Sequence, residues 1–351
     1  MWAALSDETR RLAAGSKGVC HLPTMTIPRF WAEARAQHRQ QRTQVTVRRF
    51  GWSQTSEGEA QANAQERAAD ALRRILSGEE VLRREPKLAY NGAEGVPIRE
   101  EIVAEHGKVV ITRNSYGALC LNTEQVLFAD VDFAEPDRSF FGCGFSLLLL
   151  AGSAALAWNS SGFNLKLFLL LVLPSIVAGF GLEKLGSRWV SSARGGASKI
   201  AARRIEGFIR GHQDWRLRVY QTPAGLRVLV THRTFSAEDP AVAGFFHALG
   251  TDPVYVTMCQ RQKCFRARVS PKPWRIGIAA HLRPRPGIWP VRPEALPARR
   301  AWVDAYHAKA AAFASCRFER ELGNGGMDAN VRRVMELHDQ LCRAESGLPI
   351  A

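Results

Sequence analysis

Two aspartates separated by one residue, Asp130 and Asp132, form the most compact candidate for chemistry in this sequence. They lie in the segment LFADVDF, whose alternating apolar residues predict a β-strand over 125–133. Residues i and i+2 of a strand point to the same face, so the two carboxylates are expected to be neighbours, with the apolar residues facing a core. Such a pair can hold Mg²⁺ or Mn²⁺, which also bind substrate phosphates. The alternative is a solvated strand end, or salt bridges between these aspartates and nearby arginines.

A second candidate is the segment KCFRARVSPKPWR at 263–275, in which cations alternate with aromatic residues. Basic side chains can bind phosphates while aromatic rings stack on bases, which predicts contact with a nucleotide or with nucleic acid. The alternative is a basic surface that lies against anionic lipid headgroups, anchored by Trp274. The candidate phosphate ligands of this segment are its five basic residues: Lys263, Arg266, Arg268, Lys272 and Arg275.

A further candidate depends on a resemblance. The segment LRVLVTH predicts a strand of a hairpin that ends at His232. An acidic DxD on a first strand, followed by a hairpin with a TxH-like end, resembles the archaeo-eukaryotic primase superfamily. The resemblance implies that Asp130 and Asp132 bind metal and that His232 contacts a nucleotide phosphate. The third acid of that family has no counterpart in DPVYVTMCQ or CFRARVS. Apart from the resemblance, His232 is interpreted as a structural histidine.

The elements expected around these residues follow the order of a ferredoxin-like fold. The sequence therefore predicts an α+β protein with a ferredoxin-like antiparallel sheet as its core and with flanking helices. The expected order is a strand at 125–133, a helix at 198–212, strands at 217–221 and 226–231, a helix at 239–249, and strands at 253–259 and 264–269.

Two long apolar segments, 140–158 and 163–182, predict a transmembrane helical hairpin inserted into the first crossover of this core. Lys166 is their only charged residue. Lys and Arg follow the second segment but are absent from the connecting loop, which places both termini in the cytoplasm of a bacterial cell, at its inner membrane. The alternative is a helical hairpin buried in a large soluble core.

Composition indicates the class of partner. The net charge of +15 favours anionic partners, either the headgroups of a lipid bilayer or a nucleotide or nucleic acid. The 7 cysteines include no CxxC pair, and an odd number in the cytoplasm predicts free thiols. No phosphate-binding loop and no Ser/His/Asp or Cys/His arrangement can be predicted from spacing.

The chain is predicted to comprise seven segments. Residues 1–24 contain no signal peptide, and they are interpreted as a disordered or misassigned extension before Met25. The other segments are a cytoplasmic β-α region at 25–107 (helices at 27–41, 57–84 and 97–106, a strand at 44–52), a β-meander at 108–139 (including strands at 108–113 and 117–122), the hairpin at 140–182, the ferredoxin-like region at 183–280, a proline-rich linker at 281–297 and C-terminal helices at 298–322 and 329–345.

Two functions follow from these patterns. As a whole, the chain resembles uncharacterised bacterial two-helix transmembrane proteins with YNGAEG, ITRNSYG and SPKPWRIG segments, a resemblance that implies no activity. The leading prediction is an inner-membrane protein whose basic cytoplasmic domain serves in binding or scaffolding. The alternative is a metal-dependent enzyme that handles nucleotides or phosphates, which requires Asp130, Asp132, His232 and the basic segment to line one pocket.

Overall fold

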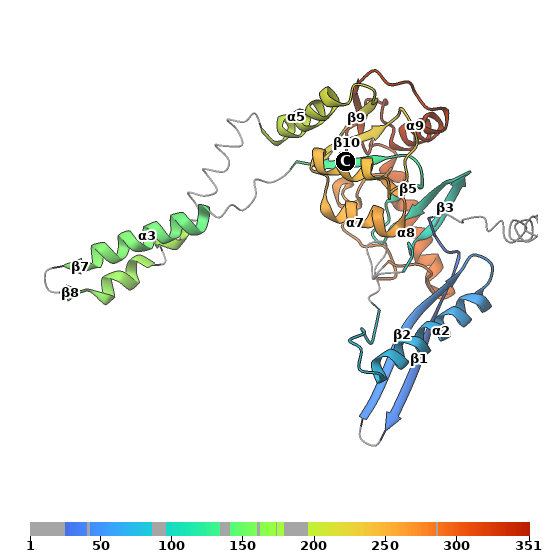
Figure 1. Ribbon diagram of the computed structural model, residues 1–351, viewed down its shortest axis with the longest axis horizontal. Helices are drawn as coiled ribbons and strands as arrows, with labels where there is room; N and C mark the ends of the chain where they lie inside the picture. Colours follow the sequence, from blue (N-terminus) through green and yellow to red (C-terminus); the bar gives the residue numbers. More distant parts are fainter. Residues whose placement is uncertain are drawn as a thin grey trace, which may run out of the picture.

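Antiparallel strand pairing organises the molecule, which we describe from a computed structural model (Figure 1). The structure describes residues 25–40, 43–85, 96–133, 141–159, 162–172, 174–178, 196–285 and 287–351. Within these residues the fold is a mixed α+β arrangement with two 4-stranded antiparallel sheets, each flanked by helices. The coarse fold class predicted from the sequence is confirmed.

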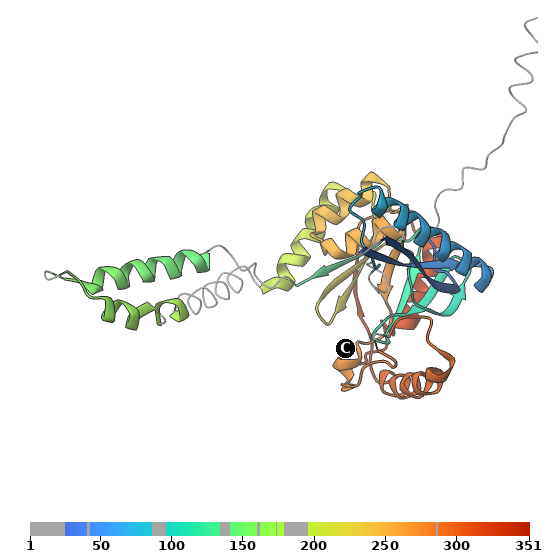
Figure 2. The same cartoon turned by 90° about the horizontal axis from the view of Figure 1, so that it is seen from below.

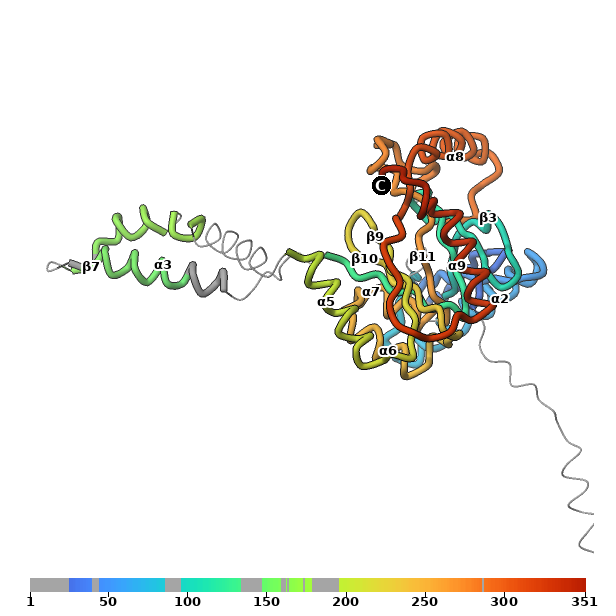
Figure 3. The backbone as a smooth tube through the Cα atoms, turned by 90° about the horizontal axis from the view of Figure 1, so that it is seen from above, coloured from blue at the N-terminus to red at the C-terminus, as the bar shows by residue number. Residues whose placement is uncertain are grey.

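The central sheet has the strand order β12-β9-β10-β6. Its strands are β6 (Phe128–Asp132), β9 (Leu217–Thr222), β10 (Gly225–Val230) and β12 (Arg317–Leu322). The alternate residues of β6 that were expected to face a core, such as Ala129 and Val131, are buried in the main hydrophobic cluster. Helices α5 (Gly196–Gly211) and α6 (Pro240–Leu249) contribute Ile205 and Phe245 to that cluster. Figure 3 shows α5 and α6 next to each other beside β10.

The opposite face of this sheet is polar. In register, Asp130 of β6 lies beside Arg227 of β10, which lies beside Tyr220 of β9. Helix α9 (Ala329–Cys342) covers this row, since the ring of His338 lies 4.8 Å from the ring of Tyr220. Charged side chains are therefore enclosed between β-strands and a helix.

The second sheet has the order β11-β5-β4-β3. Its strands are β3 (Glu101–His106), β4 (Val109–Arg113), β5 (Leu119–Thr123) and β11 (Phe265–Arg268). Helix α7 (Pro253–Gln262) connects the sheets, because the hydroxyl of Tyr255 donates to the carbonyl of Phe128 at 3.0 Å and accepts from the amide of Arg266 at 3.3 Å. The 3₁₀ helix η1 (Pro273–Ile276) follows β11. Helix α8 (Leu296–Ala310) then begins after the short η2 (Pro293–Ala295).

The N-terminal part is a hairpin of β1 (Phe30–Gln40) and β2 (Thr43–Ser53), covered by α2 (Glu57–Leu76). Figure 2 shows α2 lying along these two strands. The buried face of α2 consists of alanines: Ala60, Ala64, Ala68 and Ala71. At Gly51 of β2, a Cβ atom would lie 2.2 Å from the amide nitrogen of Ala64, so only glycine allows the helix to approach this closely.

Five predicted elements differ from the structure. The predicted helix at 57–84 ends at Leu76. The predicted helix at 27–41 is strand β1, because Ala32, Ala34 and Ala36 alternate and pack on the alanines of α2. The predicted helix at 97–106 is strand β3, which pairs with β4. The predicted strand at 253–259 is α7, whose N-cap Asp252 accepts from the amide of Val254. The predicted helix at 298–322 ends at Ala310, and its last residues form the edge strand β12.

The predicted transmembrane hairpin is wrong: among the described residues, no helix is both long and apolar enough to cross a membrane. Helix α3 (Phe141–Ala157) has 17 residues. At about 1.5 Å per residue this gives roughly 25 Å, less than the roughly 30 Å of a bilayer core. In the second apolar segment, the described helical residues are 165–172 and 174–178. The inner-membrane location, the cytoplasmic termini and the binding or scaffolding role at a membrane depended on this hairpin and are corrected with it.

The apolar segments do form a hairpin. Strands β7 (Trp158–Asn159) and β8 (Gly162–Phe163) pair at its tip, and the hydroxyls of Ser153 and Ser175 lie 2.7 Å apart across its arms. In Figure 1, α3 extends away from both sheets.

The predicted proline-rich linker at 281–297 contacts residues that adjoin the strands of the second sheet. The guanidinium Nε of Arg99 donates to the carbonyl of Trp289 at 2.7 Å, and a Cβ atom at Gly287 would lie 2.0 Å from the carbonyl oxygen of Ser115. Residues 1–24, predicted as an extension, lie outside the described residues.

Candidate anion-binding site

Asp130 and Asp132 share one face of β6, as predicted, but Asp130 forms an ion pair. Arg227 donates from Nε to Oδ1 at 2.7 Å and from Nη2 to Oδ2 at 3.0 Å. Burial opposes ionisation of Asp130, but the adjacent Arg227 outweighs it, so the pKa of Asp130 lies below its ordinary value. A cation at Asp130 would have to displace Arg227, which engages both carboxylate oxygens. Metal binding by this pair, with Mg²⁺ or Mn²⁺, stays a prediction.

Asp132 lies at the exposed end of β6, opposite Gly225 of β10. Its pKa is raised by partial burial and by two neighbouring carboxylates, Asp130 and Asp252. Lys272 and Arg268 act in the opposite direction. Asp132 is therefore close to part of the basic segment, and the structure brings these predicted residues together.

Two other predicted phosphate ligands have structural partners. Arg266 is buried and donates to Glu100 at 2.7 and 2.8 Å and to Asn122 at 2.9 Å. Lys263 forms an ion pair with Glu238 at 2.7 Å on the surface. The partner of Arg266 is itself almost fully buried, so this pair supports the fold.

His232 does not join the site. It follows the end of β10 that is opposite to Gly225 and Asp132, a separation on the order of 20 Å by strand rise. The amide of Arg216 donates to its Nδ1 at 3.4 Å, and its ring lies 4.7 Å from that of Trp215. Burial, followed by the nearby charge of Arg233, lowers the pKa of His232. These contacts agree with a structural histidine.

Arg268, Lys272 and Arg275 remain as a cluster of cations. They lie at the end of β11, at the N-cap of η1 and within η1. The pKa of Lys272 is lowered by burial and then by the charges of Arg268 and Arg275, and the pKa of Arg275 is lowered by burial and then by Arg268. The three cations therefore lie close enough to repel one another.

Two guanidinium nitrogens of this cluster lack hydrogen-bond acceptors. Nε of Arg268 and Nη1 of Arg275 are buried atoms with no partner among the described residues. A buried donor without an acceptor costs about 1–3 kcal/mol. An anionic ligand that supplied acceptor oxygens here would remove this cost.

An aromatic side chain borders the cations. Trp274 is 56% exposed, and its ring lies 5.2 Å from that of Tyr116 in an edge-on arrangement. The Nζ of Lys272 lies 5.4 Å from the centre of the Trp274 ring. An exposed indole held by a tyrosine offers a flat apolar surface next to the positive charge.

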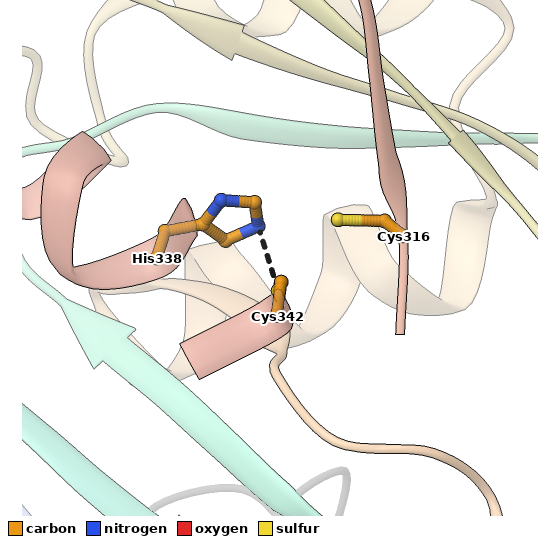
Figure 4. A group of neighbouring side chains, drawn as sticks. All are labelled: Cys316, His338 and Cys342. Carbon is orange, nitrogen blue, oxygen red and sulfur yellow. Dashed lines mark hydrogen bonds between the residues drawn. The ribbon is translucent and has the colours of Figure 1, made fainter. Parts of the chain in front are cut away.

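The polar face under α9 holds a group that was not predicted. Cys316, His338 and Cys342 are buried, and their potential ligand atoms all lie within 4.8 Å of one another (Figure 4). The available signal was the HxxxC spacing of 338–342, which places both side chains on one face of a helix. Cys316 comes from a separate segment, so its proximity depends on the tertiary fold.

Surface hollows occur elsewhere. A groove of about 610 Å³ beside α9 and a hollow of about 380 Å³ beside Trp289 include none of the three clustered cations. The former is lined by Arg218, Met335, Glu336, Asp339, Gln340, Arg343, Glu345 and Ser346. The cationic cluster is thus a surface feature outside both hollows.

Comparisons with known proteins do not identify a relative of this chain. The resemblance to the primase superfamily, including the role that it implies for His232, therefore stays a prediction. No family model, curated protein or solved structure matches the chain.

Proposed function

We propose that the cationic cluster of Arg268, Lys272 and Arg275, together with Trp274, binds a nucleoside phosphate, either free or as part of a single-stranded nucleic acid. The observation that carries the proposal is the crowding of three cations, two of which, Arg268 and Arg275, also have a buried guanidinium nitrogen without an acceptor among the described residues. Phosphate oxygens are strong acceptors and form charge-assisted hydrogen bonds with guanidinium groups.

The local charge supports an anion. Asp132 has no ion pair with an arginine among the described residues, and the charges of Lys272, Arg268 and Arg275 all act on it. One carboxylate offsets only part of that charge. A phosphate group would offset much of the remainder and relieve the repulsion that lowers the pKa of Lys272.

The position of Trp274 favours a ligand with an aromatic base. Stacking of a base on an aromatic side chain contributes about 1–3 kcal/mol and does not depend on the base sequence. Since Trp274 is more than half exposed and borders Lys272, a ligand could place its phosphate on the cations and its base on the indole.

The predicted ferredoxin-like core is part of this proposal. The order β9-β10-β6, with α5 and α6 in the connections, supports it. In this arrangement, α7 replaces the strand predicted at 253–259, and β11 is hydrogen-bonded to β5. The proposed site then lies where β6 and β11 end, next to Asp132 and Arg268.

Binding should be measured by calorimetry with inorganic phosphate, a mononucleotide and a single-stranded oligonucleotide. Lys272→Gln and Arg275→Gln should each weaken nucleotide binding about tenfold, the effect of losing one charge-assisted hydrogen bond. Matched controls are Lys263→Gln, whose residue pairs with Glu238, and Arg300→Gln on the exposed side of α8. These controls should change the affinity less than twofold. If binding depended only on the net charge of the protein, the controls would weaken it as much as the site variants do.

Two further outcomes locate the ligand. Trp274→Ala should weaken binding of the nucleotide and the oligonucleotide while leaving binding of inorganic phosphate unchanged. An affinity that rises with oligonucleotide length indicates a nucleic acid, whereas equal affinities indicate a free nucleotide. Equal losses in site and control variants, or no binding of any of the three probes at low salt, would overturn the proposal.

A further inference from the structure

We propose that Cys316, His338 and Cys342 form a buried site for a thiophilic metal ion, with Zn²⁺ or Cu⁺ as its occupant. Thiolate and imidazole groups are ligands that select these ions over hard cations such as Mg²⁺. This site is separate from the cationic cluster, and its argument does not depend on nucleotide binding.

The backbone fixes the three side chains in place. His338 and Cys342 are one turn apart on α9, and Cys316 directly precedes β12. The amide of Ser315 donates to the carbonyl of Cys342 at 3.0 Å, and the amide of Phe318 donates to the carbonyl of Ala344 at 2.9 Å. These bonds hold the two segments together on both sides of Cys316, so the arrangement is preformed. In Figure 4 the thiol of Cys316 points toward the imidazole ring, next to which Cys342 lies.

The orientation of the imidazole favours a metal ligand. Nδ1 of His338 lies 3.0 Å from Oδ1 of Asp339, whose other oxygen accepts from Arg218 at 2.8 Å. A proton on Nδ1 leaves the Nε2 lone pair directed at the thiols, and the Sγ of Cys342 lies 3.3 Å from it. Histidines that bind metals commonly donate their other N–H to a carboxylate in this way. A disulfide between the two cysteines would need neither this imidazole nor its carboxylate.

Charge also permits a cation here. Two thiolates would neutralise Zn²⁺, and neutral imidazole adds no charge. Arg227 lies near, with Nη1 3.4 Å from Nε2 of His338, but Asp130 pairs with it and the carbonyl of Arg268 accepts from the same Nη1 at 2.8 Å. When Nε2 binds a metal, Arg227 therefore loses its contact with His338 but keeps Asp130 and the carbonyl of Arg268 as partners. Three protein ligands suit Cu⁺, or a Zn²⁺ that takes water as its fourth ligand.

Burial determines how the metal would exchange. His338 and Cys316 are 0% exposed and Cys342 is 1% exposed. An ion in this position would be enclosed when the chain folds and released only when it opens. Chelator should therefore remove little metal from the native protein and all of it after unfolding.

The test is the metal content of the full chain, refolded with either Zn²⁺ or Cu⁺ under reducing conditions and then desalted. We expect about one bound ion per chain, release only on unfolding, and a melting temperature that is higher with metal than after refolding without it. X-ray absorption of the bound ion should show two sulfur ligands and one nitrogen ligand. These readouts use the wild type and do not require a variant to fold.

Variants locate the ion. Cys316→Ser and Cys342→Ser should lose the ion. The control is Cys264→Ser, which changes a buried cysteine directly before β11 and should retain the ion. The proposal would be overturned by wild-type protein that holds less than a tenth of an equivalent of either metal. It would also be overturned by equal loss of metal from Cys264→Ser, or by a Cys316 to Cys342 disulfide that forms in place of metal binding under these conditions.

Discussion

The polar face under α9 and the surface at the end of β11 are both rich in arginine, but the arginines are paired with carboxylates only under α9. Under α9, Arg227 pairs with Asp130, and Arg218 pairs with Glu321, Asp339 and Glu345. At the end of β11, no carboxylate of the described residues lies within ion-pair distance of Arg268 or Arg275, and both have a buried nitrogen without an acceptor. Paired charges between elements stabilise the fold, whereas crowded and underpaired charges at the surface are suited to a ligand.

The largest effect is expected at the buried ion pair between Arg266, which belongs to the same basic segment as the surface cluster, and Glu100. Arg266→Met should lower the free energy of unfolding by about 3–5 kcal/mol, because it leaves the carboxylate of Glu100 buried without a counter-charge. Urea denaturation would measure it. The double variant Arg266→Met/Glu100→Leu should recover most of the loss.

The matched control for Arg266 is its neighbour in the segment. Lys263→Ala removes a surface ion pair between a partly exposed lysine and an exposed glutamate, and it should cost no more than about 1 kcal/mol. If Arg266→Met and Lys263→Ala lowered the free energy of unfolding by similar amounts, burial would not distinguish the structural residues of the basic segment from those available for binding.

A somewhat smaller loss is expected for Asp130→Ala. The change leaves the guanidinium of Arg227, whose side chain is 2% exposed, without its carboxylate. Because the Asp130 side chain is 34% exposed, water can replace part of the lost contact, and we expect a cost of about 2–3 kcal/mol in chemical denaturation. A variant as stable as the wild type would contradict the assignment of this pair to the fold.

The smallest effect, and one of opposite sign, is expected for Asp132→Asn. The raised pKa of Asp132 means that the folded state binds this proton more tightly than the unfolded state. The wild type therefore loses stability as the pH rises from about 4, the pKa of an unperturbed aspartate, through the raised value. Asp132→Asn does not undergo that loss, so it should be slightly more stable than the wild type at pH 7. Below about pH 4, where Asp132 is protonated in both folded and unfolded states, the two proteins should be equally stable.

The same substitution tests the surface cluster. Removal of one negative charge beside Lys272 should tighten phosphate binding several-fold in calorimetry at low salt. Weaker binding of phosphate by Asp132→Asn would instead indicate that the carboxylate takes part in holding the ligand, as a metal-bridged site would require.

Local patterns predicted much of the fold and less of the candidate sites. Alternation placed β6, β9 and β10 correctly, and the Asp239-Pro240 start placed α6. The alanines and the two arginines of β1 have high helix propensity, and pairing with β2 together with packing on the alanine face of α2 makes this segment a strand. Whether the carboxylate of Asp130 binds Arg227 or a metal depends on the register of β6 and β10, which no local sequence pattern determines. The grouping of Cys316 with His338 likewise depends on the pairing of distant segments.

The order in which the strands enter the two sheets has a consequence for folding kinetics. The chain completes β3, β4 and β5, passes to β6, β9 and β10 of the other sheet, returns with β11 and leaves again for β12. Neither sheet can close until strands far apart in the sequence have met, which gives a high contact order and predicts folding in milliseconds to seconds rather than microseconds. A nascent chain that ends before Arg317 would also lack the edge strand of the central sheet, leaving β9 unpaired on one side. Stable folding is therefore expected only after nearly the whole chain has been synthesised.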